Sequence, residues 1–342
     1  MNILYGLSGE GYGHSSRALL VIPFLEKLGH KVKVLAYGKA ADVLKNRFDV
    51  FEIYGMHLVF ENYRINKRKT ILHNLINFPK NYFERKKIKK VIEEFKPDLC
   101  ISDYEPLTYI ISKVYHLPLI SIGNHQIMDY KKMNIAKEHY SEYLSVRAIN
   151  KSFTPSADYF IITTFLDMKN KKNVYFVPPI VREEVKKFKC SNEGKILVYL
   201  NNADYVLDVL RKINGEFIVY GFNINKKEGN LEFKTKESFE KDLANCKAII
   251  STAGFTLISE AIYLKKPLLA VPQKGQFEQV FNAITLKEKG FGDYADSGTL
   301  NERNVQNFLK NLGKYKKNLR NYKADYNKIF EVLKNVLKKV NL

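Results

Sequence analysis

The stretch CKAIISTAGFTLISEAIYLKKPLLAVPQKGQFEQVFNA, residues 246–283, decides the fold of the second half of the chain. An apolar run at 247–251 is followed by a segment of helical period at 256–264. A second apolar run at 267–271 and a second helical segment at 277–289 come next. Nearly pure apolar strands are typical of parallel sheets covered on both faces. The stretch therefore predicts a β-α-β-α unit of a doubly wound sheet.

The same alternation extends through both halves of the chain. It predicts an α/β protein with two Rossmann-like, doubly wound domains whose strand ends face a cleft, where ligands of such sheets bind. In the first half, strands are expected near 2–7, 31–37, 48–53, 98–102 and 118–123, and helices near 14–28, 81–95 and 106–115. In the second half, the remaining strands are expected near 195–200 and 216–221, and the remaining helices near 204–213 and 237–244.

The pattern pauses at 175–195, where Pro178 and Pro179 precede a charged stretch. Consecutive prolines hold the chain extended and cannot enter a following central strand. We therefore expect a hinge here, between a first domain at 1–178 and a second domain at 179–320. A C-terminal helix at 321–342 is a candidate to pack back on the first domain.

The composition favours a cytoplasmic protein. The chain has 342 residues, enough for two domains, and only three cysteines, Cys100, Cys190 and Cys246, with no CxxC spacing. The first residues do not show the basic segment followed by an apolar segment that is typical of a leader, so we expect none. No apolar run approaches the roughly 20 residues of a membrane span.

A formal net charge of +20 is concentrated in particular segments. Residues 64–96 hold 11 Lys and Arg against 3 Asp and Glu, and a second basic run spans 314–340. Apolar side chains beside the first cluster suit an anionic membrane surface, whereas its amphipathic spacing also suits a solvated helix face. No helix-turn-helix, RNP or zinc pattern accompanies the charge, so nucleic acid is not an expected partner. The apolar side chains are those of Ile71, Leu72, Leu75, Ile76 and Phe78.

The glycine loop SGEGYGHSSR, residues 8–17, excludes two nucleotide-binding motifs. A dinucleotide fingerprint needs G-x-G-x-x-G and an acid after the second strand, but His14 stands where the third glycine belongs. A P-loop needs Gly-Lys-Ser/Thr, but the sequence is Gly13-His14-Ser15. The loop instead brings His14 to the start of a helix, where the dipole keeps an imidazole neutral. His14 is thus a candidate general base, or a capping or packing histidine.

Polar side chains follow two other strands of the first half. Asp103 leaves the strand in LCISDYEPL, where it could orient His14 or cap the helix beginning near Pro106. Glu105 is a weaker candidate for the same roles. The next strand ends in Asn124, His125 and Gln126, which we expect to contact a substrate rather than to carry out chemistry.

The second half offers a site for a diphosphate and a sugar. Gly254, Phe255 and Thr256 open a helix after a buried strand, and unpaired amides there suit an anion. Glu260, one turn further on, suits the hydroxyls of a ribose. Glu278 and Gln279 begin the next helix with side chains suited to sugar hydroxyls.

These motifs resemble those of GT-B glycosyltransferases, in the superfamily of the peptidoglycan GlcNAc transferase and the UDP-glycosyltransferases. The shared pattern is Gly-x-x-Thr, an acid within one turn, a proline-led strand, acid/Gln-Gln and Asn-Ala, together with Gly-x-Gly-His-x-x-Arg near the N-terminus. Two departures stand out. Thr256 and Glu260 are four residues apart instead of three, which leaves open whether Thr256 or Phe255 occupies the phosphate position. Lys266 replaces a glycine before the proline, which we expect to alter only a turn.

The resemblance implies that the domain at 1–178 is the acceptor side and that the domain at 179–320 binds the nucleotide sugar. It also implies a role for each candidate residue. His14 would deprotonate an acceptor hydroxyl with Asp103 as its partner, and Glu260 would bind the donor ribose. Gly254, Phe255 and Thr256 would hold the diphosphate, and Glu278 and Gln279 the transferred sugar. Phe233 and Lys234 would lie by the base, and Asn201 and Asn202 by the phosphates, whereas Gly13, Glu105, Asn124 and His125 would lie on the acceptor side.

The resulting hypothesis is an inverting transfer of a sugar from a nucleotide-diphosphate sugar, most simply UDP-linked, to a hydroxyl acceptor that is a lipid or lipid-linked in related enzymes. No Asp-x-Asp signature occurs, so neither metal nor cofactor is expected. A nucleotide-sugar epimerase of the same fold and a non-catalytic nucleotide-sugar-binding subunit remain as alternatives.

Overall fold

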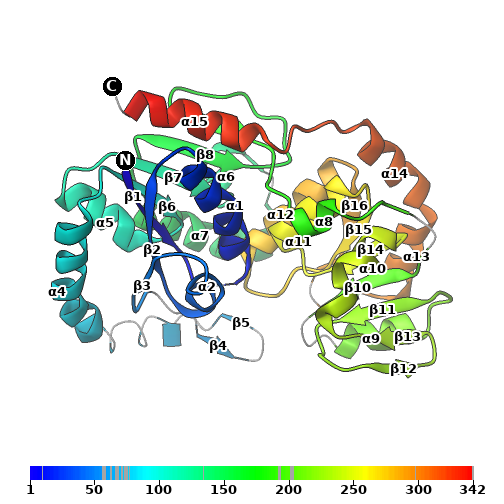
Figure 1. Cartoon of the computed structure of the whole chain (residues 1–342). Coiled ribbons are helices and arrows are strands. Elements are labelled where there is room, and N and C mark those ends of the chain that lie inside the picture. Colours follow the sequence, from blue (N-terminus) through cyan, green and yellow to red (C-terminus); the bar gives the residue numbers. More distant parts are fainter. Residues whose placement is uncertain are drawn as a thin grey trace. The chain divides into compact units, whose positions relative to one another are not determined.

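The chain divides into two compact units, which are described separately (Figure 1). The first comprises Met1–Ile180 with Asp325–Leu342, and the second Val181–Ala324. The computed structural model describes residues 1–9, 11–55, 59–61, 64–65, 69–70, 72, 76, 78–133, 135–191, 194–200, 204–296 and 298–340.

The described residues of the first unit form a parallel sheet in the order β3-β2-β1-β6-β7-β8-β9. The strands β8 and β9 lie beyond those expected from the sequence. A small antiparallel pair, β4 (Phe60–Glu61) and β5 (Arg64–Ile65), lies outside this sheet. The sheet strands are β1 (Asn2–Leu7), β2 (Lys31–Ala36), β3 (Val50–Glu52), β6 (Leu99–Asp103), β7 (Leu119–Gly123), β8 (Tyr159–Thr163) and β9 (Val174–Val177).

Helices cover both faces of this sheet because its strands are apolar on both sides. Ile3 and Tyr5 of β1 share a buried cluster with α1 (Gly13–Lys27), α2 (Gly38–Leu44) and α15 (Lys328–Val340). Leu4 faces the opposite cluster, to which α4 (Phe78–Phe95) and α5 (Pro106–Val114) contribute. The last helix, α15, is thus part of the core of the first unit (Figure 1). The shorter elements α6 (Ile127–Tyr130) and η1 (Lys137–His139) precede α7 (Tyr140–Phe153).

The second unit repeats the architecture, with the described strands in the order β12-β13-β11-β10-β14-β15-β16. Only the edge strand β12 is antiparallel to its neighbour. The strands are β10 (Ile196–Tyr199), β11 (Phe217–Tyr220), β12 (Lys226–Glu228), β13 (Leu231–Phe233), β14 (Ala248–Ser251), β15 (Leu268–Ala270) and β16 (Gly292–Tyr294). The helices are α8 (Glu183–Lys186), α9 (Asp204–Arg211), η2 (Lys236–Ser238), α10 (Phe239–Asn245), α11 (Phe255–Tyr263), α12 (Phe277–Glu288), α13 (Glu302–Lys310) and α14 (Leu312–Asn321).

Each sheet reverses its strand order at one point, which is where open α/β sheets bind ligands. In the first unit this point lies between β1 and β6, whose ends pair Leu7 with Asp103. In the second it lies between β10 and β14, whose ends pair Tyr199 with Ser251. The expected fold class, two doubly wound α/β domains, is confirmed.

The chain passes from the first unit to the second shortly after β9 and returns to the first unit at Asp325. Residues 175–177 belong to the edge strand β9, and Pro178 and Pro179 follow directly where that strand ends. The units divide between Ile180 and Val181. Within the described ranges, none of the helices combines the length and apolar character that a bilayer crossing demands.

Candidate functional site

The loop after β1 delivers His14 to the sheet edge because its glycines permit an unusual path. A side chain at Gly9 would place its Cβ 2.2 Å from the carbonyl oxygen of Tyr37. Gly11 has a φ of +80°, a conformation that glycine adopts without strain. Gly13 is the first residue of α1, so His14 lies in the first turn.

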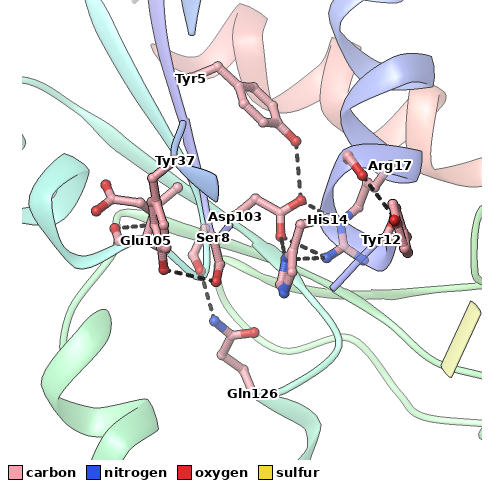
Figure 2. A network of polar contacts seen from close by, with 12 residues as sticks. Tyr5, Ser8, Tyr12, His14, Arg17, Tyr37, Asp103, Glu105 and Gln126 are labelled. Carbon is pink, nitrogen blue, oxygen red and sulfur yellow. Dashed lines mark hydrogen bonds and ion pairs between the residues drawn. The ribbon is translucent and has the colours of Figure 1, made fainter. Parts of the chain in front are cut away.

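The side chains of His14 and Asp103 are joined directly (Figure 2). Nδ1 of His14 lies 2.7 Å from Oδ1 of Asp103, and both residues are buried. Arg17 donates from Nε to Oδ2 and from Nη2 to Oδ1 of the same carboxylate, each at 2.7 Å. The hydroxyl of Tyr5 donates to Oδ2 at 3.3 Å. Four donors therefore converge on one carboxylate.

This arrangement fixes the protonation of the pair. Burial opposes the charge of Asp103, but Arg17 and His14 more than offset it and hold the pKa of Asp103 well below its usual range. Burial lowers the pKa of His14 from its ordinary 6.5, more than Asp103 raises it. A neutral His14 must donate from Nδ1, because an ionised carboxylate only accepts. Nε2 of His14 then carries the lone pair that a general base needs.

A stack of aromatic rings adjoins His14. The ring of His125 lies 5.6 Å from that of His14 and 3.9 Å from that of Tyr104, all nearly parallel. Tyr104 has a φ of +58°, which is strained for a residue with a side chain. Asn150 of α7 accepts from the Tyr104 hydroxyl at 2.9 Å and donates to the carbonyl of His125 at 3.0 Å. Asn150 thus ties the strand ends that flank His14.

The remaining acceptor-side candidates are buried nearby or serve the fold. Asn124 is 5% exposed, at the end of β7, and Gln126 donates to the Ser121 hydroxyl at 3.1 Å. Glu105 is the cap of α5, and its carboxylate accepts from the amides of Leu107 and Thr108 at 2.9 and 2.7 Å. The alternative that Asp103 caps this helix is therefore wrong, because the capping carboxylate belongs to Glu105.

In the second unit, α11 begins where the sequence predicted a helix start. The helix begins at Phe255, and its cap residue is Gly254, which has no side chain with which to cap the helix. Phe255 and Thr256 stand in the first turn of this helix, shortly after the end of β14, and the first amides of a helix have no partner within the helix itself. Ala253 has a φ of +64°, and its backbone carbonyl accepts a hydrogen bond from the side-chain Nδ2 of Asn282 at 3.1 Å. Asn282 thereby fixes the loop that leads into the helix.

Glu260 is buried and paired with an arginine that the sequence analysis did not single out. Nε and Nη2 of Arg182 donate to Oε1 and Oε2 of Glu260 at 2.5 and 3.0 Å, respectively. Arg182 also donates to Glu240 at 3.0 Å. Burial raises the pKa of Glu260 more than this pairing lowers it. Burial likewise opposes the charge of Arg182, but its two carboxylates hold the pKa of Arg182 above its usual range.

The start of α12 carries a cluster of glutamines around Gln279. Oε1 of Gln279 accepts from the backbone amide of Gln273 at 2.9 Å, and Nε2 donates to Gln276 at 2.6 Å. The cluster fixes the turn before the helix. Glu278, the other sugar candidate, is half-buried in the first turn.

Phe233 and Lys234, the candidates to lie by the nucleotide base, stand at the carboxyl end of β13, next to the edge strand β12. Phe233 is buried in the core, where it meets the ring of Phe222 edge-on. Lys234 donates from its backbone to Val219 and from Nζ to Asp242, each at 2.9 Å. Asn201 and Asn202 lie outside the described residues.

Lys266 does more than alter a turn. Its side chain is 1% exposed, and its ammonium group donates to the backbone carbonyl of Ser191. Burial lowers the pKa of this amine. The side chain of Lys266 therefore links Ser191, which precedes β10, to the connection between α11 and β15.

A family model described as "Glycosyl transferase family 1" matches residues 1–313, which include both candidate sites. The chain belongs to glycosyl transferase family 1. The suspected resemblance to GT-B glycosyltransferases is thereby confirmed.

Curated relatives of this family 1 chain carry related descriptions. A protein of Methanosarcina acetivorans described as "Uncharacterized glycosyltransferase" is 25% identical over 331 residues, covering 85% of each chain. A protein of Clostridium novyi is 22% identical over 357 residues, covering 93% of each. The latter is described as "UDP-N-acetylglucosamine--N-acetylmuramyl-(pentapeptide) pyrophosphoryl-undecaprenol N-acetylglucosamine transferase".

Solved structures share the fold of this glycosyl transferase. CalG4, the calicheamicin glycosyltransferase, has a TM-score of 0.69 at 14% identity, covering 99% of this chain and 98% of its own. The glycosyltransferase VinC in complex with dTDP has a TM-score of 0.63 at 12% identity, covering all of both chains.

Two arginines in this family 1 chain were missed as site residues. Arg17 is the arginine of the Gly-x-Gly-His-x-x-Arg motif and lies on the same face of α1 as His14, which is three residues before it, but the motif alone gives this arginine no role. Arg182 is 78 residues from Glu260, and no local pattern connects them.

Proposed function

We propose that this glycosyltransferase moves a sugar from a UDP-linked donor to an acceptor hydroxyl, with inversion and without a metal. Nε2 of His14 takes the hydroxyl proton, and the oxygen attacks the anomeric carbon. The bond from that carbon to the diphosphate breaks, and the diphosphate leaves with the electron pair. The observation that supports this proposal is the His14–Asp103 pair, with Nδ1 and Oδ1 2.7 Å apart at the strand-order reversal of the first unit.

The proposed donor site uses the second unit. Gly254, Phe255 and Thr256 would bind the diphosphate through backbone amides and the helix dipole, which stabilise the leaving charge. Glu260 would accept the ribose hydroxyls while Arg182 holds its carboxylate. Glu278 and Gln279 would bind the sugar, and the backbone at Phe233 and Lys234 would meet the base. Asn201 and Asn202 would lie near the phosphates.

The proposed acceptor is lipid-linked, and the protein is proposed to be cytoplasmic and to act at an anionic membrane surface. The description of the Clostridium novyi relative names an N-acetylmuramyl-(pentapeptide) pyrophosphoryl-undecaprenol compound. On α5, Ile110 and Val114 are 52% and 64% exposed with the exposed Lys113 between them. In the segment 64–96, where the sequence placed the membrane contact, Leu72 and Ile76 are exposed, whereas Ile71 and Leu75 lie outside the described residues. The helix α4 of this segment exposes four lysines, which complement anionic lipid. These are Lys86, Lys87, Lys89 and Lys90.

A donor screen tests the proposal. Nucleotide sugars are added to the full chain, and its thermal unfolding is followed. Lipid-linked and glycan acceptors are then added, and the products are identified by mass spectrometry. We expect UDP sugars to raise the melting temperature, since a ligand of the folded state stabilises it, and a sugar-bearing acceptor to form. Isomerisation of the donor in the absence of an acceptor would indicate an epimerase. Binding of the donor without turnover would indicate a non-catalytic nucleotide-sugar-binding subunit. Absence of any nucleotide-sugar binding would contradict the donor site.

Sedimentation with phosphatidylcholine vesicles, with and without phosphatidylglycerol, tests the membrane surface. We expect the chain to sediment with the anionic vesicles and the Val114→Glu variant to stay in solution. Ile224→Glu, which changes an exposed side chain of the second unit, is the control. Equal sedimentation of both variants would exclude α5 from the contact.

A further inference from the structure

Arg17 is a buried arginine whose two nitrogens grip one carboxylate. The side chain of Arg17 is 7% exposed and that of Asp103 is 0% exposed. Nε contacts Oδ2 and Nη2 contacts Oδ1, each at 2.7 Å. Such a planar, two-point contact fixes the orientation of a carboxylate, which a single ammonium group cannot do.

The same guanidinium also borders the imidazole. Nη2 of Arg17 lies 3.4 Å from Nδ1 of His14. A neutral His14 that donates from Nδ1 has no lone pair there for Arg17. The two groups therefore share Oδ1 of Asp103 as their acceptor, and the carboxylate bridges them.

We propose that Arg17 is a positioning residue that clamps Asp103 so that Oδ1 meets Nδ1 of His14 and Nε2 stays available as the base. This inference rests on the proposed function of His14. It adds a third member to the His14–Asp103 pair, one that acts through the carboxylate and does not itself touch the reacting atoms.

The charges around His14 give the clamp a measurable consequence. Asp103 from β6 favours protonation of His14, whereas Arg17 from α1 and His125 from the segment after β7 oppose it. Tyr5 from β1 contributes a neutral donor to Asp103. If the charge of Arg17 is removed, the carboxylate acts on His14 without that opposition, and the pKa of His14 rises.

The test compares Arg17→Met and Arg17→Lys in the full chain, with Arg147→Met as control. Arg147 is a more exposed arginine of the same unit that pairs with Asp129. The readouts are the pH profile of kcat/KM and a ¹⁵N NMR titration of His14, which gives its pKa and tautomer without turnover. We expect Arg17→Met to move the acid limb and the His14 titration upward by about one pH unit. Arg17→Lys keeps the positive charge but loses the two-point contact with Asp103. We therefore expect turnover to fall while the acid limb of the pH profile stays near its original pH.

Each outcome decides the matter. A folded Arg17→Met chain with an unshifted His14 titration would overturn the clamp. If Arg17→Met does not fold, Arg17→Lys decides: original turnover together with the original Nδ1–H tautomer would overturn it. Failure of the proposed function shows separately, as His14→Gln retaining the original turnover, because the NMR titration of the Arg17 variants does not depend on activity.

Discussion

Nδ1 of His14 lies 2.7 Å from Oδ1 of Asp103, although the residues are 89 positions apart in the chain. Adjacent parallel strands explain this proximity. β1 pairs with β6 so that Leu7 is level with Asp103, and the glycine loop returns His14 to the same edge. The pair is therefore a product of the topology, with one residue supplied by each side of the strand-order reversal.

Replacing His14 by Gln removes the proposed base. We expect kcat to fall by about 10²- to 10⁴-fold, the usual contribution of general base catalysis, while UDP binding is kept. Product formation and calorimetric titration with UDP measure the two effects. His30→Gln, a histidine that contacts the N-terminal amine, is the control. A His14→Gln chain with unaltered kcat would remove His14 from the chemistry.

The pH dependence should reflect the lowered pKa of His14. Burial places this pKa below 6.5, so the acid limb of kcat/KM is expected below pH 6.5. Stability follows the same sign. Between the folded and unfolded pKa values the unfolded chain binds a proton that the folded chain does not, so the contribution of neutral His14 is present above pH 6.5 and declines below it. Urea unfolding across this range, compared with His14→Gln, measures the difference, and parallel curves for the two chains would contradict the shift.

Glu260→Gln should weaken donor binding. A hydrogen bond to a charged group contributes about 1.5–3 kcal/mol, so we expect UDP affinity to fall about tenfold or more. Arg182 also loses one of its two carboxylate partners, which calls for a parallel check of folding by circular dichroism. Glu183→Gln changes an exposed acid of the same unit and is the control. Unchanged affinity for UDP in a folded Glu260→Gln chain would argue that the ribose binds elsewhere.

Glu105→Ala should act mainly on stability. The carboxylate caps α5, and loss of a cap costs about 1 kcal/mol, with burial of the site adding to this. Chemical denaturation measures the loss, with the exposed Glu52→Ala as control. A fall in turnover without a fall in stability would instead return Glu105 to the acceptor side.

Local pattern was sufficient for the elements around each site. The apolar runs that became β1, β6, β10 and β14 are short and pure, and the helices after them have a clear period. The strands that were not expected, such as β8 and β12, are edge or near-edge strands. Edge strands bury less apolar surface, so their sequences carry a weaker signal.

The sequence by itself determined the fold class and indicated candidate site residues, because turn glycines, strand ends and helix starts are encoded locally. Only the tertiary structure decided what those residues touch. In the folded chain, Asp103 contacts both His14 and Arg17. Glu260 pairs with Arg182, and Glu105 caps α5. Buried charges must find partners wherever the packed chain brings them, and that proximity depends on strand order and register, not on neighbouring letters.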